Sequence, residues 1–148
     1  MSEKEMEASN NEMITFSNEI VKAQKAVAAE DWECFANIFR SNDRKELFMP
    51  LDLVKNTAIH VAARSGNEQC LKELLQLLPK TEQLEVLRKP NYEQNTPLHE
   101  ALFLYDDPKM VDLIMSFMPS KSDKKELLEM KNNQNETVPF RAARYGRV

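Results

Sequence analysis

The chain has 148 residues, enough for one compact domain or a short array of repeats. Hydrophobic residues make up 42% of it and charged residues 30%, which allows both a core and a hydrated surface. The net charge of -4, with Lys and Arg scattered, argues against a dedicated nucleic-acid binder. No apolar run approaches the roughly 18 residues that a membrane-spanning helix needs.

Residues 1–12 are polar and acidic, lack the pattern of a secretory signal, and are expected to form a disordered tail. Residues 13–50 are expected to form a divergent, terminal capping unit. Residues 26–32 align with residues 62–68 at an offset of 36, which places Cys34 over Cys70. Two isolated thiols on helix faces predict small buried residues rather than a disulfide, and indicate a reducing, cytoplasmic compartment.

Residues 51–90 form the clearest unit. Thr57 is suited to begin a helix by accepting hydrogen bonds from unpaired backbone N–H groups, and Gly66 is suited to end it. A second helix is predicted by apolar residues at helical spacing. These residues are Cys70, Leu71, Leu74, Leu75 and Leu78.

The same frame recurs 39 residues later at Thr96, in a unit spanning residues 91–131, and another 41 residues on at Thr137, in a unit spanning residues 132–148. Residues 80–89 and 120–131 carry extra apolar residues, and each predicts a short helix over the end of the preceding helix pair. The last unit has no second helix. We therefore expect its apolar residues to fray, self-associate or bind another helix, and the chain to be a fragment or a truncated paralogue.

The segments Thr57–Ala63, Thr96–Leu102 and Thr137–Ala143 share a frame that resembles the ankyrin repeat, with its Thr-Pro-Leu-His-x-Ala signature. The resemblance implies an all-α solenoid of helix-turn-helix units, about three and a half repeats long. It also implies that Thr and His hydrogen-bond around each turn. The residues that match this motif are Thr57, His60, Gly66, Thr96, Pro97, His99, Thr137 and Gly146.

The ankyrin family commonly places glycine two residues before the threonine, where this chain has Lys55, Gln94 and Asn135. Asparagine adopts positive φ more readily than other non-glycine residues. We therefore expect the turns at Lys55 and Gln94 to adopt other conformations or to be mobile.

Four segments are similar to the N-terminal repeats of plant ankyrin membrane proteins related to the accelerated-cell-death group. They are residues 26–33, 56–63, 95–101 and 140–146, within a match over residues 20–146. This resemblance implies a role in stress or defence signalling. It also implies a location in the cytoplasm, or at the cytosolic face of a membrane if a longer protein contains the chain.

No residue set predicts catalysis, a cofactor or a metal site. The two histidines belong to separate turns, and two glycines cannot supply a phosphate-binding loop. The sequence therefore predicts a non-enzymatic module for an unidentified protein partner. The alternative is a structural segment with no partner of its own, and an enzyme is disfavoured.

The expected binding surface is the concave side of the first helices. Phe103 and Leu104 replace Arg64 and Ser65 of the preceding unit, which suggests an exposed apolar contact, although an inserted residue could instead rotate and bury Phe103. Arg64, Arg141 and Arg144 are expected to project from equivalent concave positions, where they could meet an acidic partner or be ordinary solvated side chains. The candidate residues are Arg64, Glu100, Phe103, Leu104, Tyr105, Arg141 and Arg144.

Overall fold

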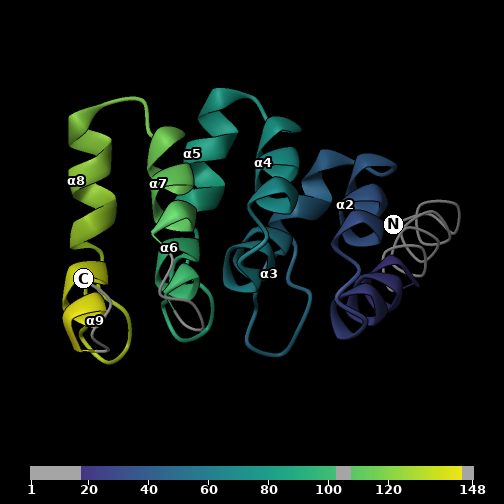
Figure 1. Cartoon of the computed structure of the whole chain (residues 1–148), viewed down its shortest axis with the longest axis horizontal. Coiled ribbons are helices and arrows are strands. Elements are labelled where there is room, and N and C mark those ends of the chain that lie inside the picture. The colour runs from purple at the N-terminus through teal and green to yellow at the C-terminus, as the bar shows by residue number, and fades with distance from the viewer. Residues whose placement is uncertain (1–17, 103–107, 145–148) are drawn as a thin grey trace, which may run out of the picture.

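The computed structural model describes residues 18–102 and 108–144, and every regular element in these ranges is helical (Figure 1). The candidate residues Phe103, Leu104 and Tyr105, the motif residue Gly146 and the tail at residues 1–12 lie outside the described residues. Residues 18–28 are helical and precede the labelled elements. The labelled elements are α2 (Trp32–Arg40), η1 (Arg44–Phe48), α3 (Ala58–Ser65), α4 (Glu68–Gln76), α5 (Lys80–Arg88), α6 (Pro97–Ala101), α7 (Lys109–Ser116), α8 (Lys121–Glu129) and α9 (Val138–Arg144).

These helices form a row of stacked units (Figure 1). The first helices of the units, α3, α6 and α9, lie along the lower part of the view, and the second helices, α2, α4 and α7, lie above them. Contacts run between neighbours of the same kind, α3 with α6, α6 with α9, α2 with α4, and α4 with α7. Each unit therefore covers the apolar side of the next, as the repeat spacing predicts.

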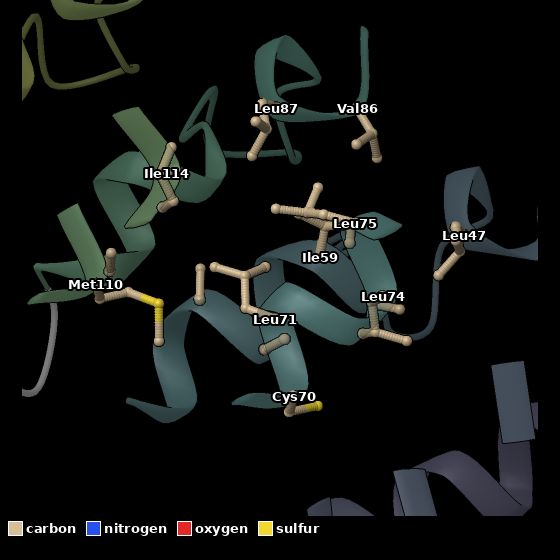
Figure 2. Packing of buried hydrophobic residues seen from close by; sticks show 14 of the residues in the cluster. Leu47, Ile59, Cys70, Leu71, Leu74, Leu75, Val86, Leu87, Met110 and Ile114 are labelled. Atoms are coloured by element: carbon tan, nitrogen blue, oxygen red, sulfur yellow. The ribbon is translucent and has the colours of Figure 1, made fainter. Parts of the chain in front are cut away.

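The core lies between these rows (Figure 2). Leu71, Leu74 and Leu75 of α4 are fully buried, together with Ile59 of α3 and Ile114 of α7. Their spacing along α4 puts one apolar stripe against both neighbouring units. Burial of one such side chain contributes about 1.5–3 kcal/mol, so this stripe accounts for much of the cohesion between units.

The first unit repeats the second at the expected offset of 36 residues, since α2 begins at Trp32 and α4 at Glu68. Glu30 even adopts a left-handed φ of 54°, at the position where Gly66 has 76°. The prediction that both thiols are buried is wrong for Cys34, which is exposed, whereas Cys70 is buried. Cys70 lines the groove between α4 and α2, whereas Cys34 lines a different groove, together with Glu19 and Lys22.

A spacer helix follows each second helix, and the two spacers expected from the sequence are α5 and α8. Gln83 of α5 donates to the backbone oxygens of Leu75 and Leu78 at 2.9 and 3.0 Å, which confirms that α5 packs over the end of the preceding pair. The 3-10 turn η1 is a third spacer, which the sequence pattern did not predict. Arg44 of η1 pairs with Glu82 of α5 at 3.4 Å, so the spacers are also linked to one another.

Candidate functional site

The turn before each first helix is closed by a threonine and a histidine. Thr57 Oγ1 accepts a hydrogen bond from the His60 backbone N–H, and His60 Nδ1 accepts one from the Thr57 N–H at 3.2 Å. Thr96 and His99 repeat this capping box in α6. The hydrogen bonding that the resemblance implied is therefore confirmed in both complete turns.

Each histidine also joins its own unit to the next. His60 Nε2 lies 3.0 Å from the carbonyl oxygen of Asn95, and His99 Nε2 lies 2.9 Å from that of Glu136. A carbonyl can only accept, so Nε2 must carry the hydrogen while Nδ1 accepts from the threonine N–H. Both turns therefore need the neutral ring in one tautomer.

Burial lowers the pKa of His60 to about 4, against hydrogen bonds to backbone carbonyls that favour the charged ring. Burial also lowers the pKa of His99. Because both ring nitrogens of each histidine are engaged, neither is placed to act as a general base. Among the described residues, no group of three or more His, Cys, Asp or Glu side chains could hold a metal ion.

The loops that lead into the first helices project from one edge of the stack (Figure 1). We call residues 52–56, 91–95 and 132–136 the three tips. Lys55, Gln94 and Asn135 have φ values of 63°, 62° and 62°, so all three tips adopt the same left-handed turn. The expectation that Lys55 and Gln94 would turn differently is wrong.

The physical reason lies at the first residue of each tip. Asp52 Oδ1 accepts hydrogen bonds from the backbone N–H groups of Val54 and Asn56, both at 3.0 Å. Asn91 and Asn132 make the same pair of bonds in their tips. These side chains hold the turn closed and offset the roughly 1–2 kcal/mol that a left-handed non-glycine residue costs.

Backbone hydrogen bonds connect successive tips. Tyr92 N–H donates to the Val54 carbonyl at 2.7 Å, and Asn133 N–H donates to the Glu93 carbonyl at 2.9 Å. The tips therefore form one continuous, laterally bonded row, whose side chains are held at fixed positions.

A chain of buried polar side chains runs beneath the tips. Asn91 Nδ2 donates to Asn56 Oδ1 at 2.8 Å and to Glu100 Oε1 at 3.0 Å. One unit further, Asn95 Oδ1 accepts from Asn132 Nδ2 at 2.9 Å and from Arg141 at 3.2 Å. We call these residues the polar ladder; it satisfies polar groups that burial would otherwise leave unbonded.

The burial of two residues of the polar ladder contradicts part of the predicted binding surface. Glu100 and Arg141 are only 5% and 6% exposed. Neither projects outward, contrary to the expectation that both belong to the binding surface. Both lie four residues after their threonine, whereas Arg64 and Arg144 lie seven residues after theirs. Arg141 therefore does not occupy a position equivalent to that of the other two arginines, and the helical turn directs it toward the neighbouring unit.

Arg64 and Arg144 remain at the surface, and each is paired with a buried carboxylate. Arg64 lies 3.8 Å from Glu100, and Arg144 lies 2.9 Å from Glu136. Burial would raise the pKa of Glu136, but hydrogen bonds from Asn132 and Arg144 and the charge of Arg141 lower it. Direct contact of these arginines with a partner stays a prediction.

Two of the exposed apolar residues on the described surface lie in the tips, and neither is a predicted site residue. Leu53 is 98% exposed and Tyr92 is 67% exposed. Both lie four residues before their threonine, at equivalent places in adjacent tips. The Lys55 ammonium lies 5.8 Å from the centre of the Tyr92 ring, a cation–π contact between the two tips. Aligning the tips as well as the helices would have revealed the pair.

Units that stack side by side, with closed turns and a row of tips, define the helical-repeat class of protein-binding scaffolds. Within that class, the chain belongs to the ankyrin repeat family. The family model described as ankyrin repeats (3 copies) matches residues 17–125, well over half of the chain.

A chain from the crystal structure of the yeast ribosomal protein Rps3 in complex with its chaperone Yar1 has a similar fold. The TM-score is 0.66 with 18% sequence identity, over 88% of this chain and 86% of that chain. No curated protein matches the sequence. In the described part of the chain, no helix combines the length and apolar character required to cross a membrane.

Proposed function

We propose that this protein is a non-enzymatic module that binds a protein partner along its row of tips. The observation that carries the proposal is the pair Leu53 and Tyr92, two exposed apolar side chains at equivalent positions of adjacent tips. Ankyrin repeats serve as protein-interaction modules, which agrees with this role. Exposed apolar residues gathered on a fixed frame commonly mark an interaction site.

The frame beneath these residues favours binding because it limits the entropy lost on association. The backbone bond from Tyr92 to Val54 and the ladder bond from Asn91 to Asn56 fix the spacing of the two tips. A partner would then meet side chains that are already in place. Tyrosine is also enriched among the residues that dominate binding energy in protein interfaces.

The test is proximity capture with a photo-crosslinker placed at Glu93, between the two apolar residues in the row. We expect the chain with unaltered tips to crosslink a defined protein. The yield of that crosslink should fall at least about tenfold in a Leu53→Ser/Tyr92→Ser variant. Val21→Ser is the matched control, because Val21 is also an exposed apolar residue but lies on helical residues 18–28.

Reciprocal capture, with the crosslinked protein as bait, must recover this chain for the result to count as support. A capture pattern that is the same for Leu53→Ser/Tyr92→Ser and for Val21→Ser would contradict binding at the tips. Absence of any specific capture would favour a structural segment with no partner.

We further propose that the protein works in the cytoplasm in plant stress or defence signalling. Support comes from the motifs at residues 26–33, 56–63 and 95–101, which are similar to those of the plant accelerated-cell-death-like group. A fluorescent fusion expressed in leaf cells tests the location, and loss of the gene tests the role. A normal response to pathogens and osmotic stress in the null plant would oppose it.

A further inference from the structure

The two ends of the described stack carry opposite charge. At one end, a groove beside α2 is lined by Glu19, Asp31 and Glu33, with Lys22 as its basic residue. At the other end, a groove between α8 and α9 is lined by Lys121, Lys124 and Lys125, with Glu129 as its acidic residue. We call these the acidic end groove and the basic end groove.

The acidic end groove has the form of an interface between units. Four of its lining residues are the α2 N-cap Asp31 and the α2 residues Glu33, Cys34 and Asn37. They lie 36 positions before Asn67, Gln69, Cys70 and Glu73. Those four residues line the groove in which α4 meets α2. The helix α2 therefore presents outward the same positions that α4 uses to contact its neighbour, which explains why Cys34 is exposed and Cys70 is buried.

The basic end groove has an apolar floor. Leu128 and Pro139 line it. Phe140, the next residue of α9 after Pro139, is 57% exposed. Phe140 stands where the other units have histidine, and so it makes no link of the kind that His60 and His99 make. An apolar floor with lysines at its rim fits a partner surface that is partly apolar and negatively charged.

We propose that the occupant of the basic end groove is the acidic end groove of a second copy of this chain. Copies would then join end to end, with the lysines of α8 facing Glu19 and Glu33, and Phe140 packing near Cys34. Such a head-to-tail contact leaves one groove open at each end, so it builds dimers and longer rows rather than a closed pair. Its opposite charges make it sensitive to salt.

The test uses two variants, each with one altered end. Lys124→Ser/Phe140→Ser alters the basic end groove, and Glu33→Lys/Cys34→Arg alters the acidic one. None of these four side chains makes a hydrogen bond within the capping turns or the polar ladder, and circular dichroism checks that both variants fold. Sedimentation velocity is run on each variant, on their mixture and on the wild type.

We expect the wild type to self-associate with increasing concentration and to lose this association between about 0.05 and 0.5 M salt, as the Debye length shortens. Each variant alone should be monomeric. The mixture should form a dimer and nothing larger, because only one intact acidic groove and one intact basic groove can meet.

A wild type that stays monomeric up to about 1 mM, the range of very weak binding, would overturn the proposal. So would variants that associate alone as the wild type does, or a mixture that stays monomeric. The Leu53→Ser/Tyr92→Ser variant should self-associate normally, so this result is independent of binding at the tips.

Discussion

His60 and His99 join neighbouring units only while their rings are neutral. A proton on Nδ1 of His60 would place an N–H group against the Thr57 N–H that now donates to it at 3.2 Å. Burial also disfavours the charged form of each ring, which lowers the pKa of both histidines. Protonation is therefore opposed by the folded state and favoured by the unfolded one.

We predict that the protein loses stability as the pH falls from about 6.5, the ordinary histidine pKa, toward the folded pKa of His60, about 4. In this window the unfolded chain binds more protons than the folded chain, so the free energy of unfolding falls with pH. His60 alone should account for about 2 kcal/mol between about pH 7 and pH 5, and His99 adds to it. Urea unfolding at a series of pH values measures this.

The variants His60→Gln and His99→Gln provide the control. Each should be less stable at neutral pH, and each should show a shallower pH dependence over the same window. The window stops at about pH 5 because Glu136, whose pKa is lowered, adds its own loss of stability at lower pH. Glu46, whose pKa is raised by burial, acts in the opposite direction. Stability that is flat across the window would contradict the role of the neutral rings.

At the scale of elements, the polar ladder binds α9 to α6 through one amide. Asn95 Oδ1 accepts from Asn132 and Arg141, and Asn95 Nδ2 donates to Glu100 at 3.2 Å. Removing this amide takes a hydrogen bond from three buried side chains, and two of them are charged groups.

We predict that Asn95→Ala lowers the free energy of unfolding by about 3 kcal/mol, because each buried polar group left unsatisfied costs about 1–3 kcal/mol. Hydrogen exchange should show the largest loss of protection in α9. Asn37→Ala is the control, since Asn37 lies exposed on α2 and should change stability by less than about 0.5 kcal/mol. A uniform loss of protection along all units would argue against a local link.

The sequence predicts those elements whose signals are local. The caps at Thr57 and Thr96, the end of α3 at Gly66 and the apolar stripe of α4 are all encoded within one turn or one helix. The expectation for the tips is wrong because the left-handed turn is set by Asp52 and Asn91, three residues before the turn residue. Their hydrogen bonds replace the need for glycine.

The candidate surface was harder to predict because burial of a charged side chain depends on its neighbours in space. Glu100 and Arg141 would be exposed on an isolated helix, and they are buried because Asn91 and Asn95 of the ladder reach them. The exposed residues Leu53 and Tyr92 occupy equivalent positions in the repeat alignment, and this equivalence is a signal that the sequence contains. That signal lies in the tips, which differ from the family pattern in having no glycine.

At the scale of the whole molecule, the row of units makes stability depend on neighbours. The main contacts between the described second helices join adjacent units, α2 with α4 and α4 with α7, so unfolding should spread from the ends. The last described unit has a single helix, α9, held by α6 and α8. The chain also has one tryptophan, Trp32, in the first unit, which reports on the opposite end.

We predict that Leu127→Ala separates the unfolding of the two ends. Leu127 is fully buried in α8, and its truncation should cost about 2–5 kcal/mol locally. Far-ultraviolet circular dichroism should show part of the helix content lost at lower urea, while Trp32 fluorescence keeps nearly its original midpoint. Leu74→Ala, an equally buried change in the central helix α4, is the matched control and should move both signals together. Coincident signals in Leu127→Ala would mean that α8 and α9 unfold with the whole stack, and that coupling along the row exceeds the stability of its terminal unit.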